Sequence, residues 1–170
     1  MNKTVATQSA LGIAAVTLLV TLAQADSKSD RLRAIDALEL DLTEAAALAT
    51  ESNPGNIIEA EFEVEDDRGI WEIEIVNAAN QTVSVEVDGL TGEILASEIE
   101  DDDDERPLNL TDTINLETAI NVVKAIESGA VIEAELEDEH GELVWEVEAL
   151  NANQEKIKVH VNAYTGEVLI

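Results

Sequence analysis

The sequence predicts an α+β fold of two tandem repeats, each with one helix packed on a small antiparallel β-meander in the order α-β-β-β-β. Two observations lead to this prediction. A shift of 74 positions aligns the two halves of the chain without a gap. The aligned pairs include Trp71 and Trp145, Gly55 and Gly129, and Thr91 and Thr165. Within each repeat the apolar spacing changes from the 3.6-residue period of a helix to the two-residue period of strands. Two copies are too few for a stacked array, which favours a pair of small domains.

Residues 1–25 have the layout of a secretory signal peptide. Lys3 is followed by an uncharged apolar run over residues 10–23, which is too short to cross a bilayer core of about 30 Å as a helix. The run ends in the small residues Ala23 and Ala25, as signal peptidase requires. We expect cleavage after Ala25 and a periplasmic or secreted bacterial protein that is not inserted in the membrane. The alternatives are an uncleaved anchor or an apolar N-terminal helix.

Residues 26–40 are predicted to form an amphipathic helical lead-in, and the first repeat follows over residues 41–96. The apolar face of the lead-in consists of Leu32, Ile35 and Leu38. The repeat begins with a capping box, in which Asp41 caps the helix and Glu44 reaches back to the cap. One apolar stripe then faces the core. It consists of Leu42, Ala45, Ala46 and Ala49. Pro54-Gly55 ends the helix.

Three strands and a short fourth strand are predicted after the first helix. Apolar residues alternate with polar ones, which is typical of strands with one buried face. The buried sets are Ile58, Ala60, Phe62 and Val64; Trp71, Ile73 and Ile75; and Val83, Val85 and Val87. Turns are expected at residues 66–69, 77–80 and 88–92, and the fourth strand lies around Ile94-Leu95.

Residues 97–113 are predicted to be an acidic linker, and the second repeat covers residues 114–170. Five consecutive acids at residues 101–105 repel one another and stay solvated. In the second repeat Asn115 takes the cap position, and Ser128-Gly129 gives a weaker helix stop. The helix stripe recurs as Leu116, Ala119, Ile120 and Val123. Whether the two repeats contact each other is left open.

Composition excludes several classes of function. Nine Lys and Arg against 38 Asp and Glu give a charge of −29, which is incompatible with binding DNA, RNA or an anionic membrane surface. Four aromatic residues provide no platform for stacking bases, and the absence of Cys excludes thiol catalysis. His140 and His160, predicted to be simply solvated, do not form an H-E-x-x-H motif. We therefore expect a protein that is not an enzyme.

Motifs in both repeats resemble the PepSY domain family. The first repeat carries Asn53-Pro54-Gly55, Trp71-Glu72-Ile73-Glu74 and Val87-Asp88-Gly89-Leu90-Thr91-Gly92-Glu93-Ile94-Leu95. The second carries Trp145-Glu146-Val147-Glu148 and Val161-Asn162-Ala163-Tyr164-Thr165-Gly166-Glu167-Val168-Leu169. Ser128 and Asn162 depart from the usual Pro and Asp of the family. The resemblance implies a small extracytoplasmic binding module of the kind found in propeptides of metallopeptidases, and it supplies no catalytic residue.

The candidate site is a set of carboxylates on one face of the first sheet, joined by the acidic run of the linker. Its members are Glu59, Glu61, Glu63, Glu72, Glu74, Glu86, Asp101 and Asp103. Cross-strand neighbours approach to about 5 Å, where like charges destabilise a sheet unless cations intervene. The second repeat supplies such cations as Lys156, Lys158 and His160, whereas the first has Thr82, Ser84 and Glu86 at these positions. We expect the first sheet to accept a cation or a basic partner surface and the second to be mainly structural.

Two functions of different classes follow from this pattern. The first is a regulatory protein that binds, modulates or inhibits an extracytoplasmic peptidase or another protein with a basic surface. The alternative is a calcium-binding or calcium-sensing protein that uses the acidic sheet and the Asp run. Any calcium binding should be weak, because a flat sheet cannot wrap the ion and Arg106 stands where an EF-hand loop needs Gly. No other cofactor is expected. An alternative explanation of the acidity is adaptation to a saline environment, with solubility as its only purpose.

Overall fold

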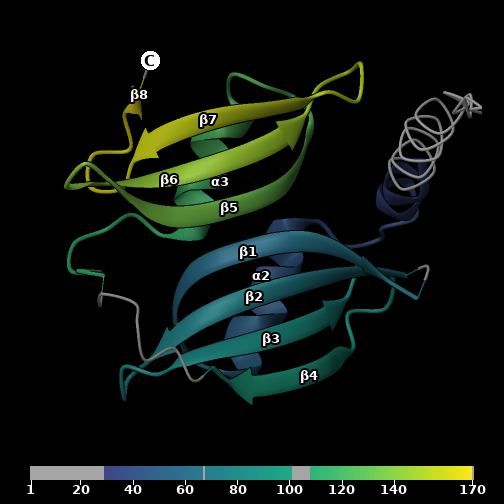
Figure 1. The fold of residues 1–170 in the computed structure, drawn as a ribbon, viewed down its shortest axis with the longest axis horizontal. Coiled ribbons are helices and arrows are strands. Elements are labelled where there is room, and N and C mark those ends of the chain that lie inside the picture. Colours follow the sequence, from purple (N-terminus) through teal and green to yellow (C-terminus); the bar gives the residue numbers. More distant parts are fainter. Residues whose placement is uncertain (1–28, 67, 101–107, 170) are drawn as a thin grey trace, which may run out of the picture.

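The computed structural model describes residues 29–66, 68–100 and 108–169. The expected signal peptide and the candidate ligands Asp101 and Asp103 lie outside the described residues. The fold is α+β, with helices against one face of an eight-stranded antiparallel sheet (Figure 1). In chain order the elements are α2 (Leu42–Ser52), β1 (Gly55–Glu65), β2 (Arg68–Asn77), β3 (Thr82–Asp88), β4 (Ile94–Ile99), α3 (Leu116–Lys124), β5 (Ala130–Glu139), β6 (Glu142–Leu150), β7 (Lys156–Asn162) and β8 (Val168–Leu169).

The sheet is continuous across the two halves of the chain. Its strand order is β4-β3-β2-β1-β5-β6-β7-β8, so β1 and β5 are the two central strands. Their antiparallel pairing is short and joins Glu59 to Glu135, Ala60 to Ala134 and Glu61 to Glu133. The question that the sequence left open is thus answered, because the two halves share backbone hydrogen bonding at this joint. We call these three pairs the seam.

The helix caps are those that the sequence predicts. The Asp41 side chain accepts a hydrogen bond from the backbone of Glu44, and the Glu44 side chain accepts one from the backbone of Asp41, which completes the capping box. Asn115 caps α3 by accepting from the backbone of Thr118. Lys124, at the end of α3, lies 3.0 Å from Asp41. This ion pair links the two helices on the side of the sheet opposite the carboxylates.

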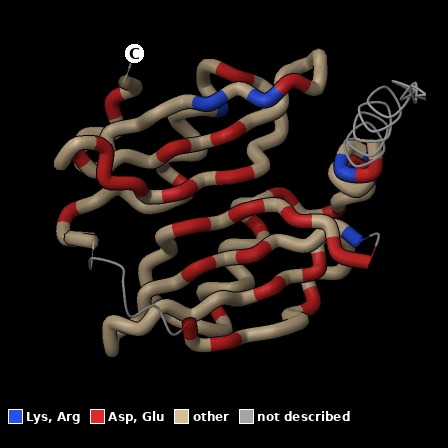
Figure 2. The backbone as a smooth tube through the Cα atoms, in the orientation of Figure 1, with Lys and Arg blue, Asp and Glu red and all other residues tan. Residues whose placement is uncertain are grey.

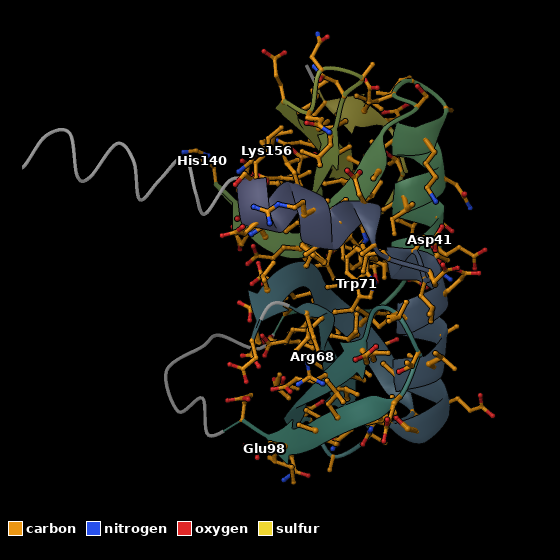
Figure 3. The ribbon with its side chains drawn as sticks, turned by 90° about the vertical axis from the view of Figure 1, so that its right-hand side faces the viewer. Asp41, Arg68, Trp71, Glu98, His140 and Lys156 are labelled. Atoms are coloured by element: carbon orange, nitrogen blue, oxygen red, sulfur yellow. The ribbon has the colours of Figure 1, made fainter. Side chains whose placement is uncertain are left out.

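The core lies between the helices and the sheet. The predicted helix stripes of α2 and α3 are buried, as are the apolar faces of the strands around Trp71 and Trp145. Trp71 donates its indole N–H to the carbonyl of Leu40, and Trp145 donates to that of Ile114, each at 3.1 Å. Each indole therefore anchors the segment that leads into its helix. Trp71 is labelled in Figure 3. Val64, expected in the core, is exposed near the tip of the β1–β2 hairpin.

Two expected boundaries are wrong. The lead-in was expected to be helical to residue 40, but its described helix covers residues 29–36, and the chain then turns so that Leu40 can accept from Trp71. The linker was expected to begin at Ser97, but β4 continues to Ile99 because it pairs along β3. Among the described residues, no helix has the length and apolar character needed to cross a membrane.

Candidate functional site: an acidic sheet face

The carboxylates of both halves lie on the sheet face that the helices leave open. The strand register aligns them in two rows across the sheet (Figure 2). One row runs Ser84, Glu74, Glu59, Glu135, Glu146 and His160. The other runs Glu86, Glu72, Glu61, Glu133, Glu148 and Lys158. We call the surface formed by these two rows, together with the adjoining Glu63 of β1, the acidic face. It spans the seam and is therefore one surface rather than two.

The half of the acidic face formed by β1–β3 contains a tight carboxylate cluster. Glu61, Glu63 and Glu72 each offer an oxygen, and these three oxygens lie within 4.8 Å of one another. Glu72 also accepts a hydrogen bond of 2.7 Å from the Ser84 hydroxyl. Glu86 is the register partner of Glu72 on β3. The sequence-predicted members Glu59, Glu61, Glu63, Glu72, Glu74 and Glu86 are thus brought onto one surface.

The half formed by β5–β7 is partly neutralised by its own cations. Lys156 pairs with Glu148, and Lys158 pairs with Glu146. Burial alone would raise the pKa of Glu146, but hydrogen bonds from Lys158 and His160 outweigh it and lower that pKa. The expectation of self-neutralisation in this half agrees with these contacts.

His160 differs from its prediction as a simply solvated residue. Its Nε2 lies 2.9 Å from Glu146, and its Nδ1 lies 3.6 Å from Glu139. These three side chains form another group whose ligand atoms lie within 4.8 Å of one another. His140, by contrast, is exposed in the β5–β6 turn, as predicted.

Crowding at the seam shifts two carboxyl groups strongly. Burial, followed by the charges of Glu135 and Glu74, raises the pKa of Glu59 to about 8. Burial, followed by a hydrogen bond with Glu63 and the charge of Glu133, raises the pKa of Glu61 to about 7. Each carboxyl group therefore retains its proton more readily than an exposed glutamate does. The acidic face therefore gains negative charge as Glu59 and Glu61 lose their protons with rising pH through the neutral range.

Sequence reasoning missed part of this surface. The sequence predicts that the second repeat forms a separate, mainly structural sheet, but the seam places its Glu133 and Glu135 directly beside Glu61 and Glu59 of the first repeat. The 74-residue repeat indicates that these glutamates face the same way in each copy. It contains no signal that β1 pairs with β5, and that pairing is what makes the four carboxylates neighbours.

The repeated Thr-Gly-Glu segments, residues 91–93 and 165–167, are structural turns, as the sequence predicts. Asp88 accepts hydrogen bonds from the backbone N–H groups of Leu90 and Thr91, and the Thr91 contact lowers the pKa of Asp88. Asn162 accepts from the same two turn positions in the other half, Tyr164 and Thr165. Replacing Asp by Asn at this position therefore preserves the turn.

Moving the cations of β7 onto β3 should stabilise the protein. The variant Thr82→Lys, Ser84→Lys, Glu86→His places on β3 the residues found 74 positions later. We expect Tm at low salt to rise by about 2–4 °C, the shift given by about 1 kcal/mol in a chain of this size. Differential scanning calorimetry at 10 mM and 500 mM NaCl measures this, because salt should remove most of the gain. Glu51→Lys, on the exposed end of α2, adds two positive charges away from the acidic face, against three in the β3 variant, and so tests whether added positive charge stabilises the chain wherever it is placed. An equal gain in that control would contradict the argument.

The PepSY domain, described as the peptidase propeptide and YPEB domain, matches the chain at residues 39–98 and 113–169. The two matches cover more than half of the chain and coincide with α2–β4 and α3–β8. The chain therefore belongs to the PepSY family, as its motifs indicate. No curated protein sequence matches it.

Two solved structures resemble the chain. A candidate lipoprotein (CD1622) of Clostridium difficile 630 shares 18% identity over 78% of this chain and 92% of its own, with a TM-score of 0.45. The YpmB protein of Bacillus subtilis shares 20% identity over 75% of this chain and 93% of its own, with a TM-score of 0.35. Both TM-scores lie below 0.5, so the family assignment depends on the matched domains rather than on these structures.

Proposed function

We propose that this chain is an exported, non-enzymatic PepSY protein that binds a basic surface of another extracytoplasmic protein and modulates or inhibits it. The observation that supports the proposal is the asymmetry of the acidic face. Strand β7 supplies Lys156 and Lys158 to its glutamates, whereas β3 supplies Thr82 and Ser84 at the equivalent positions. The β1–β3 half therefore carries carboxylates that a partner's cations can pair with.

Two further points favour this function. The signal-peptide pattern of residues 1–25 supports export to the periplasm or the cell exterior. The description of the matched family, a peptidase propeptide domain, makes a peptidase the first partner to test. Opposite charges across an interface speed association and exclude wrong partners, which suits a regulatory protein.

A partner pull-down tests this proposal. The tagged chain is incubated with extracytoplasmic extract at low salt, beside the Thr82→Lys, Ser84→Lys, Glu86→His variant as a matched control. We expect a stoichiometric complex with a basic protein that is lost at 500 mM NaCl and lost with the variant. A partner retained equally by both proteins would exclude the β1–β3 half of the acidic face as its binding surface.

Divalent-cation binding is the second candidate, because one observation favours it specifically. The oxygens of Glu61, Glu63 and Glu72 lie within 4.8 Å of one another, close enough for one ion to contact all three. Calcium takes six to eight oxygens at about 2.3–2.6 Å, so water would have to complete its shell on this open surface. We therefore propose weak calcium binding, with no other cofactor. Asp101 and Asp103 remain proposed contributors outside the described residues.

Thermal unfolding with calcium, magnesium and sodium at matched ionic strength tests the cation proposal. If the site exists, calcium should raise Tm above the sodium control, with a gain that grows with the logarithm of the calcium concentration and reaches about 2.7 kcal/mol of added stability at 100 times Kd. Glu61→Gln with Glu72→Gln should then remove the calcium response, while Glu93→Gln, in an exposed turn, should retain it. Identical responses to all three salts would reduce the effect to screening and reject the site.

A further inference from the structure

Strand β4 forms one edge of the sheet, and its outer backbone groups face no other strand in the described part of the chain. The N–H of Glu100 donates to the carbonyl of Thr82 at 3.0 Å, which fixes the hydrogen-bonded register against β3. Hydrogen-bonding direction alternates along an antiparallel strand, so the N–H and C=O groups of Ser97 and Ile99 point away from β3. These groups form a template for another strand (Figure 1).

This edge lacks two of the usual protections against pairing. Natural edge strands are commonly blocked by Lys, by Pro or by being very short. Strand β4 has six residues without Lys or Pro, and the Ile99 side chain is 57% exposed. The opposite edge strand, β8, covers only Val168–Leu169. The edge formed by β4 is therefore the better of the two for adding a strand.

The two faces of β4 require different side chains from an added strand. On the acidic face, Glu98 is paired with Ser84 and Ala96 with Glu86, so carboxylates border the edge. Figure 3 shows Glu98 at this end of the molecule. On the helix face, Ser97 and Ile99 are paired with the buried Val85 and Val83. A complementary strand would carry basic residues on the first face and apolar residues on the second.

We infer that β4 captures an extended segment of a partner protein in which basic and apolar residues alternate, and adds it to the sheet as a further strand. A second copy of this chain is a poorer occupant. Pairing of β4 with β4 would bring Glu98 and Glu100 close to the same residues of the copy, and each chain already carries a charge of −29. Like charges opposite each other destabilise a sheet. This inference deepens the proposed function, because it names the form and chemistry of the segment that the basic partner would offer.

Peptide binding to the full chain at low salt tests the inference. The probe is acetyl-Lys-Val-Lys-Val-Lys-Val-Lys-amide, with affinity measured by calorimetry and amide exchange by NMR. In antiparallel pairing the valines lie opposite Ser97 and Ile99, so their N–H groups donate to β4 while those of the lysines point outward. We expect methylation of the valine backbone nitrogens to weaken binding at least tenfold. Methylation of the lysine backbone nitrogens should leave binding almost unchanged. The bound peptide should slow amide exchange at Ser97 and Ile99.

Three outcomes would overturn the inference. Equal affinity of the two N-methylated peptides would mean binding by charge alone on the acidic face, which would preserve the proposed function and reject the added strand. No binding of any peptide would reject the edge as a capture site. A dimer joined at β4, detected by light scattering and undisturbed by the peptide, would assign the edge to a second copy.

Discussion

Replacing Gly129 by alanine is expected to destabilise the protein by about 3 kcal/mol or more and to lower Tm by about 10 °C. A Cβ at this position would lie 1.5 Å from the carbonyl oxygen of Leu150 and 2.5 Å from its carbonyl carbon. These are backbone atoms at the end of β6, so the clash cannot be relieved by a rotamer change. The sequence identified Gly129 only as a weak helix stop, but the structure assigns it a close approach at the entry to the seam strand β5.

Gly166→Ala is the matched control for this prediction. Gly166 has φ of +73° in the turn before β8, and its Cβ would meet nothing closer than Ile114 at 3.9 Å. The expected cost is therefore only the left-handed backbone strain of about 1 kcal/mol, or about 2–4 °C in Tm. Urea unfolding of both variants measures the difference. Equal destabilisation of the two variants would show that the contact with Leu150 is not what requires glycine.

The parts of the fold that depend on residues close together in the sequence could be predicted from the sequence alone. The Asp41–Glu44 capping box, the buried stripes of both helices and the Asp88 turn each involve residues within a few positions of one another. Hydrogen-bonding partners at such short range are constrained by the residue types alone. The end of β4 was not predicted, because its last residues are fixed by pairing with β3 rather than by an apolar pattern of their own.

The seam could not be predicted for a related reason. Alternation along residues 55–65 tells which side chains share a face, but it is the same whether the strand lies at an edge or in the centre of a sheet. The pairing of Ala60 with Ala134 joins residues from different repeats, and neither repeat needs the other to explain its own pattern. The sequence therefore found the carboxylates of each half and missed that they form one surface.

The contact of His160 was missed because it depends on strand register. The sequence correctly placed His160 on the polar face of its strand. Its partner Glu146 lies directly opposite on β6, and this position follows only from the hairpin register between β6 and β7. Once that register is known, a contact between His160 and Glu146 at a cross-strand position is the expected arrangement.

Stability should fall as the pH rises from about 5 to about 8, and Glu59→Gln should flatten that fall. The folded state raises the pKa of Glu59 from 4.5 to about 8, so between these values the folded chain holds a proton that the unfolded chain has released. The stabilising contribution of this group is complete below pH 4.5 and is lost as the pH approaches 8. Glu61, with its pKa raised to about 7, acts in the same direction.

The groups facing Glu59 show which part of the sheet is destabilised as the pH rises. The charges that raise its pKa belong to Glu135, Glu74, Glu61 and Glu133, and two of these lie across the seam on β5. Deprotonation therefore adds repulsion at the joint between the two halves. Asp88 and Glu146 have lowered pKa values, so their contributions are lost instead as the pH falls into the acid range. Together these groups predict greatest stability near pH 5 at low salt.

Thermal unfolding at half-unit steps from pH 4 to pH 9 measures this profile. Glu59→Gln should unfold at least about 2 °C above the unmodified chain at pH 8 and close to it at pH 4.5, because glutamine cannot acquire the charge. Glu93→Gln, in an exposed turn away from the seam, should follow the unmodified profile. Amide exchange at Ala60 and Ala134 should quicken with pH more than base catalysis alone requires, and less so in Glu59→Gln. A profile that is level or rising between pH 5 and pH 8 would show that the seam carboxylates do not hold these protons.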